Sequence, residues 1–269
     1  MERVEIDSGI ANGSRVYDYL VGGRDNFAVD REAAEQMTAD LPGGLDSARS
    51  NARANRVFLG RSVRRLAGDF GIRQFLDIGT GIPTAGNTHE VAQQVAPESR
   101  IVYVDNDAMV LAHAQHLLRS TPEGATTYLH ADLREPDEIL GQAAETLDFR
   151  QPIALMLLAV LQMVTDDEGA HGVVTRLMKA LPSGSYLAIS HLTGDFMPVL
   201  MADAIARLNE RVRETLVLRS RDEVARFFDG FDVLEPGVVQ VDDWLRVESP
   251  PPTAKGWTNP LYVGIGRKR

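Results

Sequence analysis

Three aspartates stand where a ligand-binding α/β sheet would present them. Asp77 opens the segment DIGTG of residues 77–81, which follows an apolar run and precedes a stretch with helical periodicity. Asp105 and Asp132 each end a later apolar run of strand length. Because ligands of such sheets bind outside the carboxyl ends of parallel strands, we expect the three carboxylates on one rim of one sheet.

Gly79 and Gly81 give the first segment the form of a nucleotide-binding turn, because glycine lets the backbone turn tightly and lets a ligand approach closely. We expect Gly79, Thr80 and Gly81 to contact the ligand. A dinucleotide would place its pyrophosphate on this turn, but the third glycine of that fingerprint falls at Thr84 here.

Asp77 distinguishes between two cofactors. Like charges a few ångströms apart in a low-dielectric cleft repel strongly, so a carboxylate at this position disfavours a pyrophosphate. S-adenosylmethionine has no phosphate and carries an α-ammonium and a sulfonium, which a carboxylate attracts. The turn therefore favours S-adenosylmethionine. The alternative is that Asp77 only caps the turn.

The other rim residues fit the adenosine part of such a cofactor. Asp105, followed by Asn106, can accept hydrogen bonds from both ribose hydroxyls, a role that a dinucleotide would use as well. Asp132 can accept a hydrogen bond from the adenine amino group, and Leu133 can pack on the adenine ring. Ala159 follows the fourth apolar run and is expected at the same rim.

Further candidates lie outside these strand ends. Tyr17 and Asn26 could form a lid over the cofactor, with the aromatic face near the sulfonium; Tyr17 could equally pack the N-terminal helices. Arg24 could hold the methionine carboxylate as a bidentate partner, or be a solvated arginine in a turn. His191 follows the fifth apolar run and could deprotonate an acceptor hydroxyl or amine, or be a structural histidine. No metal site is expected.

The elements that must position these residues alternate from residue 71 onward between apolar runs of strand length and helical segments. This alternation predicts an α/β fold with a doubly wound, mostly parallel sheet. The fully apolar run 152–158 belongs in the sheet centre, and the two late runs suit an antiparallel edge. The expected strands are 73–78, 100–104, 126–130, 152–158, 185–190, 231–239 and 261–266.

The first seventy residues show helical segments and no strand. They predict an N-terminal helical cap over residues 1–70, followed by one compact cofactor-binding domain over residues 71–269. Within the cap, helices are expected to begin at Ser14, at Asp30 and at Asp46 or Ser47. Further helices are expected from the capping-box pairs 87/90, 165/168 and 220/223, over 107–119, and in the inserted segment 197–215.

Composition limits the function classes. The chain has 28 Lys and Arg against 38 Asp and Glu, a formal net charge of −10, which disfavours a nucleic-acid partner. The arginines between positions 49 and 65 are expected to form a solvated face. The absence of cysteine excludes disulfides and fits a reducing compartment. The longest apolar run, 153–161, is shorter than the roughly 20 residues of a membrane helix. We expect a cytoplasmic protein without a membrane partner; its oligomeric state stays open.

Residues 75–81 (FLDIGTG), 102–105 (VYVD) and 131–133 (ADL) resemble the first three motifs of class I S-adenosylmethionine-dependent methyltransferases. This resemblance implies a seven-stranded, Rossmann-like sheet, binding of S-adenosylmethionine and methyl transfer. Pro83 departs from the pattern, because it stands where a third glycine often occurs. The turn should be stiffer there.

A narrower resemblance covers essentially the whole chain. Residues 14–27 (SRVYDYLVGGRDNF), 53–56 (RANR) and 190–191 (SH) resemble an actinobacterial family of S-adenosylmethionine-dependent methyltransferases, formerly grouped as a domain of unknown function. The resemblance attaches no substrate, and we expect a small-molecule acceptor. The alternatives are a non-catalytic, regulatory S-adenosylmethionine-binding module and an NAD(P)-dependent oxidoreductase.

Overall fold

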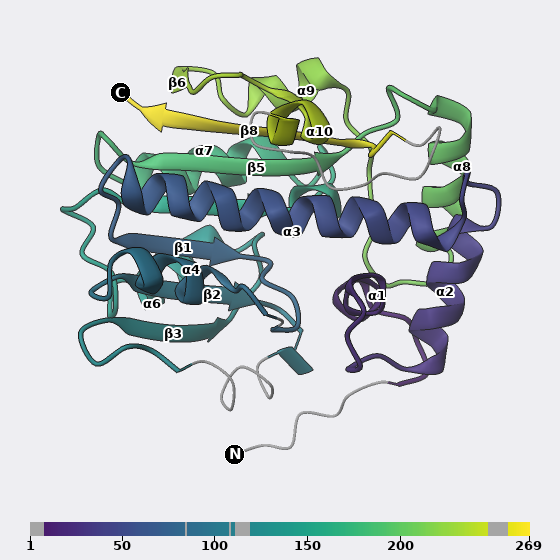
Figure 1. Cartoon of the computed structure of the whole chain (residues 1–269), viewed down its shortest axis with the longest axis horizontal. Helices are drawn as coiled ribbons and strands as arrows, with labels where there is room; N and C mark the ends of the chain where they lie inside the picture. The colour runs from purple at the N-terminus through teal and green to yellow at the C-terminus, as the bar shows by residue number, and fades with distance from the viewer. Residues whose placement is uncertain (1–7, 84, 108, 111–118, 247–257) are drawn as a thin grey trace.

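One central sheet with helices on both faces organises the molecule (Figure 1). The computed structural model describes residues 8–83, 85–107, 109–110, 119–246 and 258–269. Its strands are β1 (Gln74–Ile78), β2 (Arg100–Asp105), β3 (Ala125–His130), β4 (Ala154–Leu158), β5 (Tyr186–Leu192), β6 (Phe231–Val233), β7 (Val239–Gln240) and β8 (Leu261–Lys268).

The strand order is β3-β2-β1-β4-β5-β8-β6, with β7 pairing to β8 off this path. The first five of these strands are parallel, and β8 runs antiparallel to both β5 and β6. This order confirms a doubly wound, mostly parallel sheet whose late strands form an antiparallel edge.

Alternate side chains of the central strands enter two separate cores, which explains why these strands are apolar on both faces. In β1, Phe75 faces one core while Leu76 and Ile78 face the other. The first core lies under α3 (Leu45–Gly68), α4 (Thr88–Val95) and α10 (Val241–Leu245), and the second under α6 (Pro136–Ala143), α7 (Ala170–Ala180) and α9 (Arg221–Arg226).

A third group of helices stands beyond the carboxyl ends of the strands: α1 (Gly13–Val21), α2 (Ala28–Thr38) and α8 (Pro198–Asn209) (Figure 1). They share a core that includes Val16, Ala33 and Leu208. The first half of α3 contributes Ala48 to this core, whereas its second half packs Phe58 against the sheet. The helical cap and the cofactor-binding domain therefore share α3, and the boundary expected at residue 70 falls just after this helix. The α8 helix, which is inserted later in the sequence, packs with the cap.

All three cap helices begin one or two residues before the expected positions, α1 at Gly13, α2 at Ala28 and α3 at Leu45. Asn12 caps α1, because its Oδ1 accepts hydrogen bonds from the N–H groups of Ser14 at 2.8 Å and Arg15 at 3.3 Å. The α2 helix follows Phe27, whose N–H donates to the carboxylate of Asp30 at 2.8 Å. Ser14 and Asp30 are thus inside their helices, and Asp30 caps α2 from its first turn.

Two other expectations were wrong in extent. Thr165 and Glu168 form the reciprocal hydrogen bonds of a capping box, but they close a turn, and α7 begins only at Ala170. The strand expected over 231–239 splits into β6 and β7. Pro236 has no N–H to pair there, and Gly237 adopts a φ of +94° in the turn between the two strands.

Most of the helix expected over 107–119 lies outside the described residues, as does Thr84. The capping box of Ser220 and Glu223 is present at the start of α9. Within the described ranges, none of the helices combines the length and the apolar character that a membrane crossing requires.

Candidate active site

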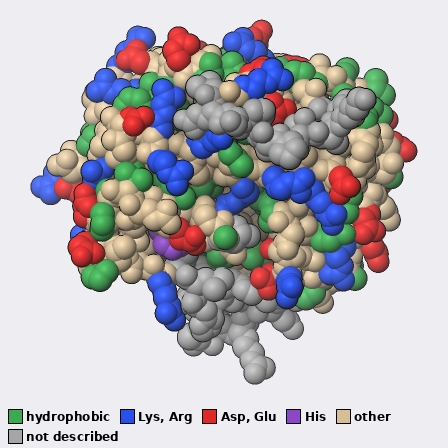
Figure 2. Space-filling view, viewed as in Figure 1, with side chains coloured by type: hydrophobic (Ala, Val, Ile, Leu, Met, Phe, Trp, Pro, Cys, Tyr) green, Lys and Arg blue, Asp and Glu red, His purple; other side chains and the backbone are tan. Residues whose placement is uncertain are grey.

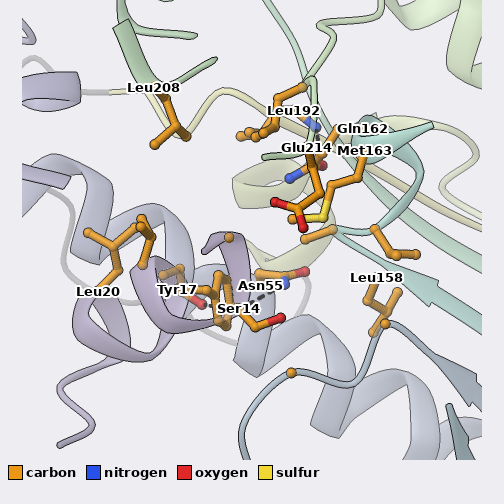
Figure 3. Close-up of a pocket in the computed structure, with 18 of the residues that line it drawn as sticks. Ser14, Tyr17, Leu20, Asn55, Leu158, Gln162, Met163, Leu192, Leu208 and Glu214 are labelled. Atoms are coloured by element: carbon orange, nitrogen blue, oxygen red, sulfur yellow. Dashed lines mark hydrogen bonds between the residues drawn. The ribbon is translucent and has the colours of Figure 1, made fainter. Parts of the chain in front are cut away.

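A cavity of about 190 Å³ lies between the carboxyl ends of the parallel strands and the cap helices (Figure 3). The turn after β1 and the segments after β2, β3 and β4 form its sheet side, and α1, α2, α3 and α8 form its cap side. The sequence-predicted residues that line it are Tyr17, Asp77, Gly79, Thr80, Gly81, Asp105, Asn106, Asp132, Leu133 and Ala159. The three strand-end aspartates therefore share one rim.

Two glycines with left-handed backbone conformations shape the turn after β1. Gly79 has a φ of +74°, and a Cβ there would lie 2.3 Å from Cγ2 of Val160. Gly81 has a φ of +65°, and open space lies beside it. The N–H groups of Gly79 and Thr80 donate to the carbonyl of Val104 at 2.8 and 3.4 Å. The turn needs glycine at position 79 for packing as well as conformation, and at position 81 for conformation.

Asp105 links the second strand to the glycine turn. Its carboxylate accepts hydrogen bonds from the backbone N–H groups of Gly81 at 2.8 Å and Asp107 at 2.9 Å. Only 6% of the residue is exposed, and this burial raises its pKa to about 6 against the lowering effect of the two N–H donors. Because a carboxylate offers about four acceptor positions, acceptor capacity remains for the hydroxyls of a ligand.

Asp77 is equally buried, with 5% of the residue exposed. Thr88 Oγ1 donates to its carboxylate at 2.6 Å. Burial raises the pKa of Asp77 to about 6, while the Thr88 hydrogen bond and the charge of Arg56 act in the opposite direction. Asp77 and Asp105 have both lost much of their hydration, so a ligand that brings a positive charge or a hydrogen-bond donor would stabilise them.

Asp132 differs from the other two aspartates because it already has a direct ion pair. Its carboxylate accepts hydrogen bonds from the Arg134 N–H at 2.8 Å, from the Arg134 guanidinium at 3.1 Å and from Asn106 Nδ2 at 2.9 Å. Burial by itself would raise the pKa of Asp132, but these donors together hold it below its usual value.

A chain of hydrogen bonds ties Tyr17 to the sheet. Its hydroxyl donates to the carbonyl of Ala52 at 3.2 Å and accepts from Asn55 Nδ2 at 3.0 Å, and Asn55 Oδ1 accepts from Ser190 Oγ at 2.7 Å. Figure 3 shows Tyr17, Asn55 and Ser14 together along one wall of the cavity. Burial raises the pKa of Tyr17, so its hydroxyl stays neutral. The chain fixes α1 against α3 and β5.

Arg24 and Asn26 are not among the residues that line the cavity. Arg24 is exposed in the turn between α1 and α2. Asn26 Nδ2 donates to Asp18 Oδ2 at 2.8 Å, and Asn26 Oδ1 accepts from Arg31 at 3.0 Å. Asn26 therefore fixes the shape of this turn, and the arrangement gives no support to a cofactor contact by either residue.

His191 is fully buried and does not line the cavity. Its Nδ1 is 2.7 Å from the carbonyl of Leu192, and Arg219 Nη1 donates to its Nε2 at 2.7 Å. Burial lowers the pKa of His191 to about 4, and the charge of Arg219 lowers it further against the Leu192 hydrogen bond. A neutral ring with both nitrogens engaged has no free position for a substrate proton, which argues against the expected role as a base.

The cavity also includes polar residues that sequence reasoning did not assign to it. Asn55 and Arg56 belong to the RANR segment, so the motif itself was a usable signal. Arg56 Nη2 donates to the carbonyls of the loop 85–86 at 3.2 and 3.1 Å, close enough to Asp77 to influence its pKa. Gln162, in the short helix η1 (Leu161–Met163), and Glu214, in the loop after α8, lie in segments without a motif.

The arginines of α3 take two roles: Arg53 and Arg64 are exposed, as expected of a solvated face, whereas Arg61 and Arg65 bind neighbouring loops. Arg61 donates to the carbonyl of Leu245 at 2.9 Å, and Arg65 donates to the carbonyl of Glu235 at 3.2 Å. Figure 2 shows Lys and Arg side chains spread over this face of the molecule with Asp and Glu side chains among them. The positive charges are therefore interrupted.

The hydrogen bonds of the glycine turn suit S-adenosylmethionine better than a dinucleotide. In dinucleotide-binding folds the pyrophosphate lies against this turn and the following helix N-terminus. Here the N–H groups of Gly79 and Thr80 bind the Val104 carbonyl, and the Gly81 N–H binds Asp105. A pyrophosphate would meet two buried carboxylates in place of these donors. A cofactor with ribose hydroxyls and a cationic amino-acid end meets complementary groups.

Comparison with known proteins gives a consistent result. The family model described as S-adenosyl methyltransferase matches residues 1–269. A DUF574 family protein from Streptomyces avermitilis is 43% identical, with 98% of this chain and 100% of that chain covered and a TM-score of 0.91. A proposed methyltransferase from Thermobifida fusca is 39% identical, with 98% and 97% covered and a TM-score of 0.86.

More distant structures share the fold alone. A SAM-dependent methyltransferase from Anabaena variabilis is 14% identical, with 88% of this chain and 94% of that chain covered and a TM-score of 0.56. Among curated proteins, no relative matches the chain significantly.

Proposed function

The chain belongs to the S-adenosyl methyltransferase family and is an S-adenosylmethionine-dependent methyltransferase, and we propose that it methylates a small molecule enclosed between the cofactor and the cap helices. The observation that carries this proposal is that one cavity is lined both by the strand-end aspartates and by apolar side chains of α1, α2 and α8. One ligand bound at the aspartates and another under the cap would lie side by side in it.

We assign the cofactor contacts by charge and position. Asp77 would hold the α-ammonium, Asp105 the ribose hydroxyls, and Asp132 with Leu133 the adenine. Arg56 replaces Arg24 as the candidate for the methionine carboxylate, because it lines the cavity beside Asp77. Gly81 would let the cofactor approach the backbone, since open space lies beside it.

When bound, S-adenosylmethionine supplies a methyl group on a positively charged sulfur, which is already a good leaving group. The protein then has to orient the acceptor and keep water out. Positioning of this kind can supply about 7–11 kcal/mol of a reaction barrier. The Ser190–Asn55–Tyr17 chain would contribute by fixing α1 at the cavity wall. The folded arrangement thus serves as a rigid frame, and no metal is needed for the proposal.

The assignment of Asp105 is tested by its substitution with asparagine, which preserves the shape of the side chain but removes its charge. Hydrogen bonds to a charged group contribute about 1.5–3 kcal/mol each, so S-adenosylhomocysteine should bind at least about tenfold more weakly. Calorimetry measures this affinity, with the exposed Asp167→Asn as the matched control. Unchanged affinity in Asp105→Asn would remove the ribose contact from the proposal.

Catalysis itself is tested by incubating the wild-type protein with methyl-labelled S-adenosylmethionine and a metabolite extract. Label in a small molecule supports the proposal. If the protein binds the cofactor but transfers no labelled methyl group to any component of the extract, the result favours a regulatory module instead. Label confined to macromolecules would refute a small-molecule acceptor.

A further inference from the structure

The cap side of the cavity combines an apolar wall with a few polar side chains, among them Ser14 and Tyr17 of α1, Asn51 and Asn55 of α3, and the carboxyl group of Glu214. Its apolar lining comes from α1, α2, α8 and the segments after α2 and α8, and includes Leu20, Met37, Leu41, Met201, Ile205, Leu208 and Leu216. Glu214 belongs to the same segment after α8 and lines the same cavity. In Figure 3 its carboxyl group points into the cavity, next to Met163 and on the side opposite Asn55.

Glu214 Oε2 is a buried oxygen without a hydrogen-bond partner among the described residues. Burying a polar group without a partner costs about 1–3 kcal/mol, and more for a charged group. Such an atom in a binding cavity therefore indicates a missing donor. A ligand that enters the cavity can supply this donor.

The charges around Glu214 indicate the sign of that ligand. Among the described residues that line the cavity, the acidic ones are Asp77, Asp105, Asp132 and Glu214, and the basic ones are Arg56 and Arg134. Both arginines are already bound by other groups. Arg56 donates to the carbonyls of the loop 85–86, and Arg134 donates to Asp132, to Glu168 and to the Met163 carbonyl. The three aspartates are assigned to the cofactor, so Glu214 is the acidic group among these residues that is left for the acceptor. Its charge disfavours an anionic acceptor and favours a cationic one.

We propose that Glu214 and the apolar cap wall form a binding site for an amine carried on an apolar skeleton, and that this amine is the methyl acceptor. The inference rests on the proposed function and adds the chemical class of the acceptor. Glu214 Oε2 accepts a hydrogen bond from the ammonium group, while the skeleton contacts Leu20, Ile205 and Leu208. The proton passes from the ammonium to Glu214, which leaves a neutral amine with a free lone pair. With the cofactor bound, this nitrogen would form a bond to the methyl carbon as the bond between methyl and sulfur breaks, so that the electron pair stays on sulfur, S-adenosylhomocysteine leaves and the methylated amine carries the positive charge.

An alcohol on the same skeleton would satisfy the Glu214 oxygen with a hydrogen bond but would not compensate a charge. A carboxylic acid would add repulsion. The order of affinity that follows from the structure is amine, then alcohol, then carboxylate. The ammonium adds an attraction between opposite charges that a hydroxyl group lacks, and this attraction should give the amine an advantage of about tenfold or more.

Three amines serve as probes: phenethylamine, hexylamine and tryptamine, each compared with the alcohol and the carboxylate of the same skeleton. Binding is measured near neutral pH by ligand-observed NMR with the protein saturated by S-adenosylhomocysteine. The variants are Glu214→Gln and the matched control Glu210→Gln, which changes an exposed glutamate at the end of α8. The affinity of each variant for S-adenosylhomocysteine is measured separately and should stay within about threefold of wild type, which shows that both variants fold.

The proposal is supported if at least one amine binds the wild type and Glu210→Gln more tightly than its alcohol and carboxylate, and if Glu214→Gln loses this preference. It is overturned if the wild type shows no preference for any amine, or if the preference survives in Glu214→Gln. Wild-type protein that fails to bind S-adenosylhomocysteine would contradict the proposed function first, and with it the acceptor class. The two failures are therefore distinguishable.

Discussion

The affinity for the cofactor should depend on pH in the range between 5 and 8, because burial raises the pKa values of both Asp77 and Asp105 to about 6. Each carboxylate is proposed to bind its part of the cofactor in the ionised form. At pH 5, about one tenth of each group is ionised in the free protein. Affinity should then be about tenfold lower per carboxylate than at pH 8, and about a hundredfold lower for two independent groups, or about 2.7 kcal/mol.

The loss of cofactor affinity at low pH can be distinguished from unfolding, because the unliganded protein should become more stable as pH falls. Asp77 and Asp105 have higher pKa values in the folded protein, about 6, than in the unfolded chain. Their contribution to stability is therefore complete below the unfolded-state pKa and is lost as pH rises through about 6. Protonation of Asp77 and Asp105 therefore stabilises the unliganded fold at pH 5. Weaker binding at pH 5 is expected from a folded protein, which circular dichroism can verify.

Asp77→Asn isolates one of the two groups. Thr88 Oγ1 can still donate to the amide oxygen, so the contact seen at 2.6 Å has a replacement. The variant should bind S-adenosylhomocysteine about tenfold more weakly at pH 8, and its affinity should fall only about tenfold from pH 8 to pH 5. Its unliganded form should be more stable at pH 8 by on the order of 2–3 kcal/mol, the free energy that corresponds to the pKa shift.

Calorimetric titrations of wild type, Asp77→Asn and the exposed control Asp167→Asn at several pH values measure these quantities. The reasoning is refuted if the wild-type affinity changes by less than about twofold between pH 5 and pH 8. It is equally refuted if Asp77→Asn retains the full pH dependence of the wild type.

Three further substitutions test the frame of the site. Gly79→Ala should lower the free energy of unfolding by about 2–4 kcal/mol in urea titrations, because φ is +74° and the new Cβ would meet Val160 at 2.3 Å. His191→Ala should cost about 2–4 kcal/mol of stability by leaving a cavity beside Arg219. At saturating cofactor, the wild-type rate of methyl transfer should show no step near pH 6.5 that depends on His191, since the pKa of His191 is about 4; a step that vanishes in His191→Ala would restore it as a base. Tyr17→Phe should cost about 1–2 kcal/mol, because Asn55 Nδ2 loses its acceptor, whereas Tyr19→Phe removes an exposed hydroxyl and should change stability by less than about 0.5 kcal/mol.

The strand ends were predictable from the sequence because they depend on local patterns. Asp77, Asp105 and Asp132 follow apolar runs, and parallel strands must present their carboxyl ends together. The glycine turn was predictable for a related reason, since Gly79 and Gly81 tolerate the left-handed conformations that the turn requires. These features need only the order of strands to bring them together.

The cap side of the site was not predictable in the same way, because it depends on how helices distant in sequence pack together. Glu214 follows α8 and meets α1 only through tertiary packing, so no spacing in the sequence points to it. His191 illustrates the opposite error. Its position after β5 suggested the rim, but the β5 backbone directs it to the buried Arg219, about which the sequence carries no local signal. Arg24 and Asn26 do not line the cavity, and the sequence could not indicate this because an exposed turn and a lid share the same polar residues.

The unliganded protein carries two desolvated carboxylates whose ionised forms raise its free energy, and a bound cofactor relieves this cost. A ligand stabilises a fold by RT ln(1 + [L]/Kd), so a hundredfold higher Kd at pH 5 should reduce the stabilisation by S-adenosylhomocysteine by about 2.7 kcal/mol. Protonation of Asp77 and Asp105 meanwhile contributes stability to the unliganded form over the same range. Melting temperatures with and without the ligand should therefore converge as pH falls from 8 to 5. Curves that stay parallel would mean that neither carboxylate meets the cofactor.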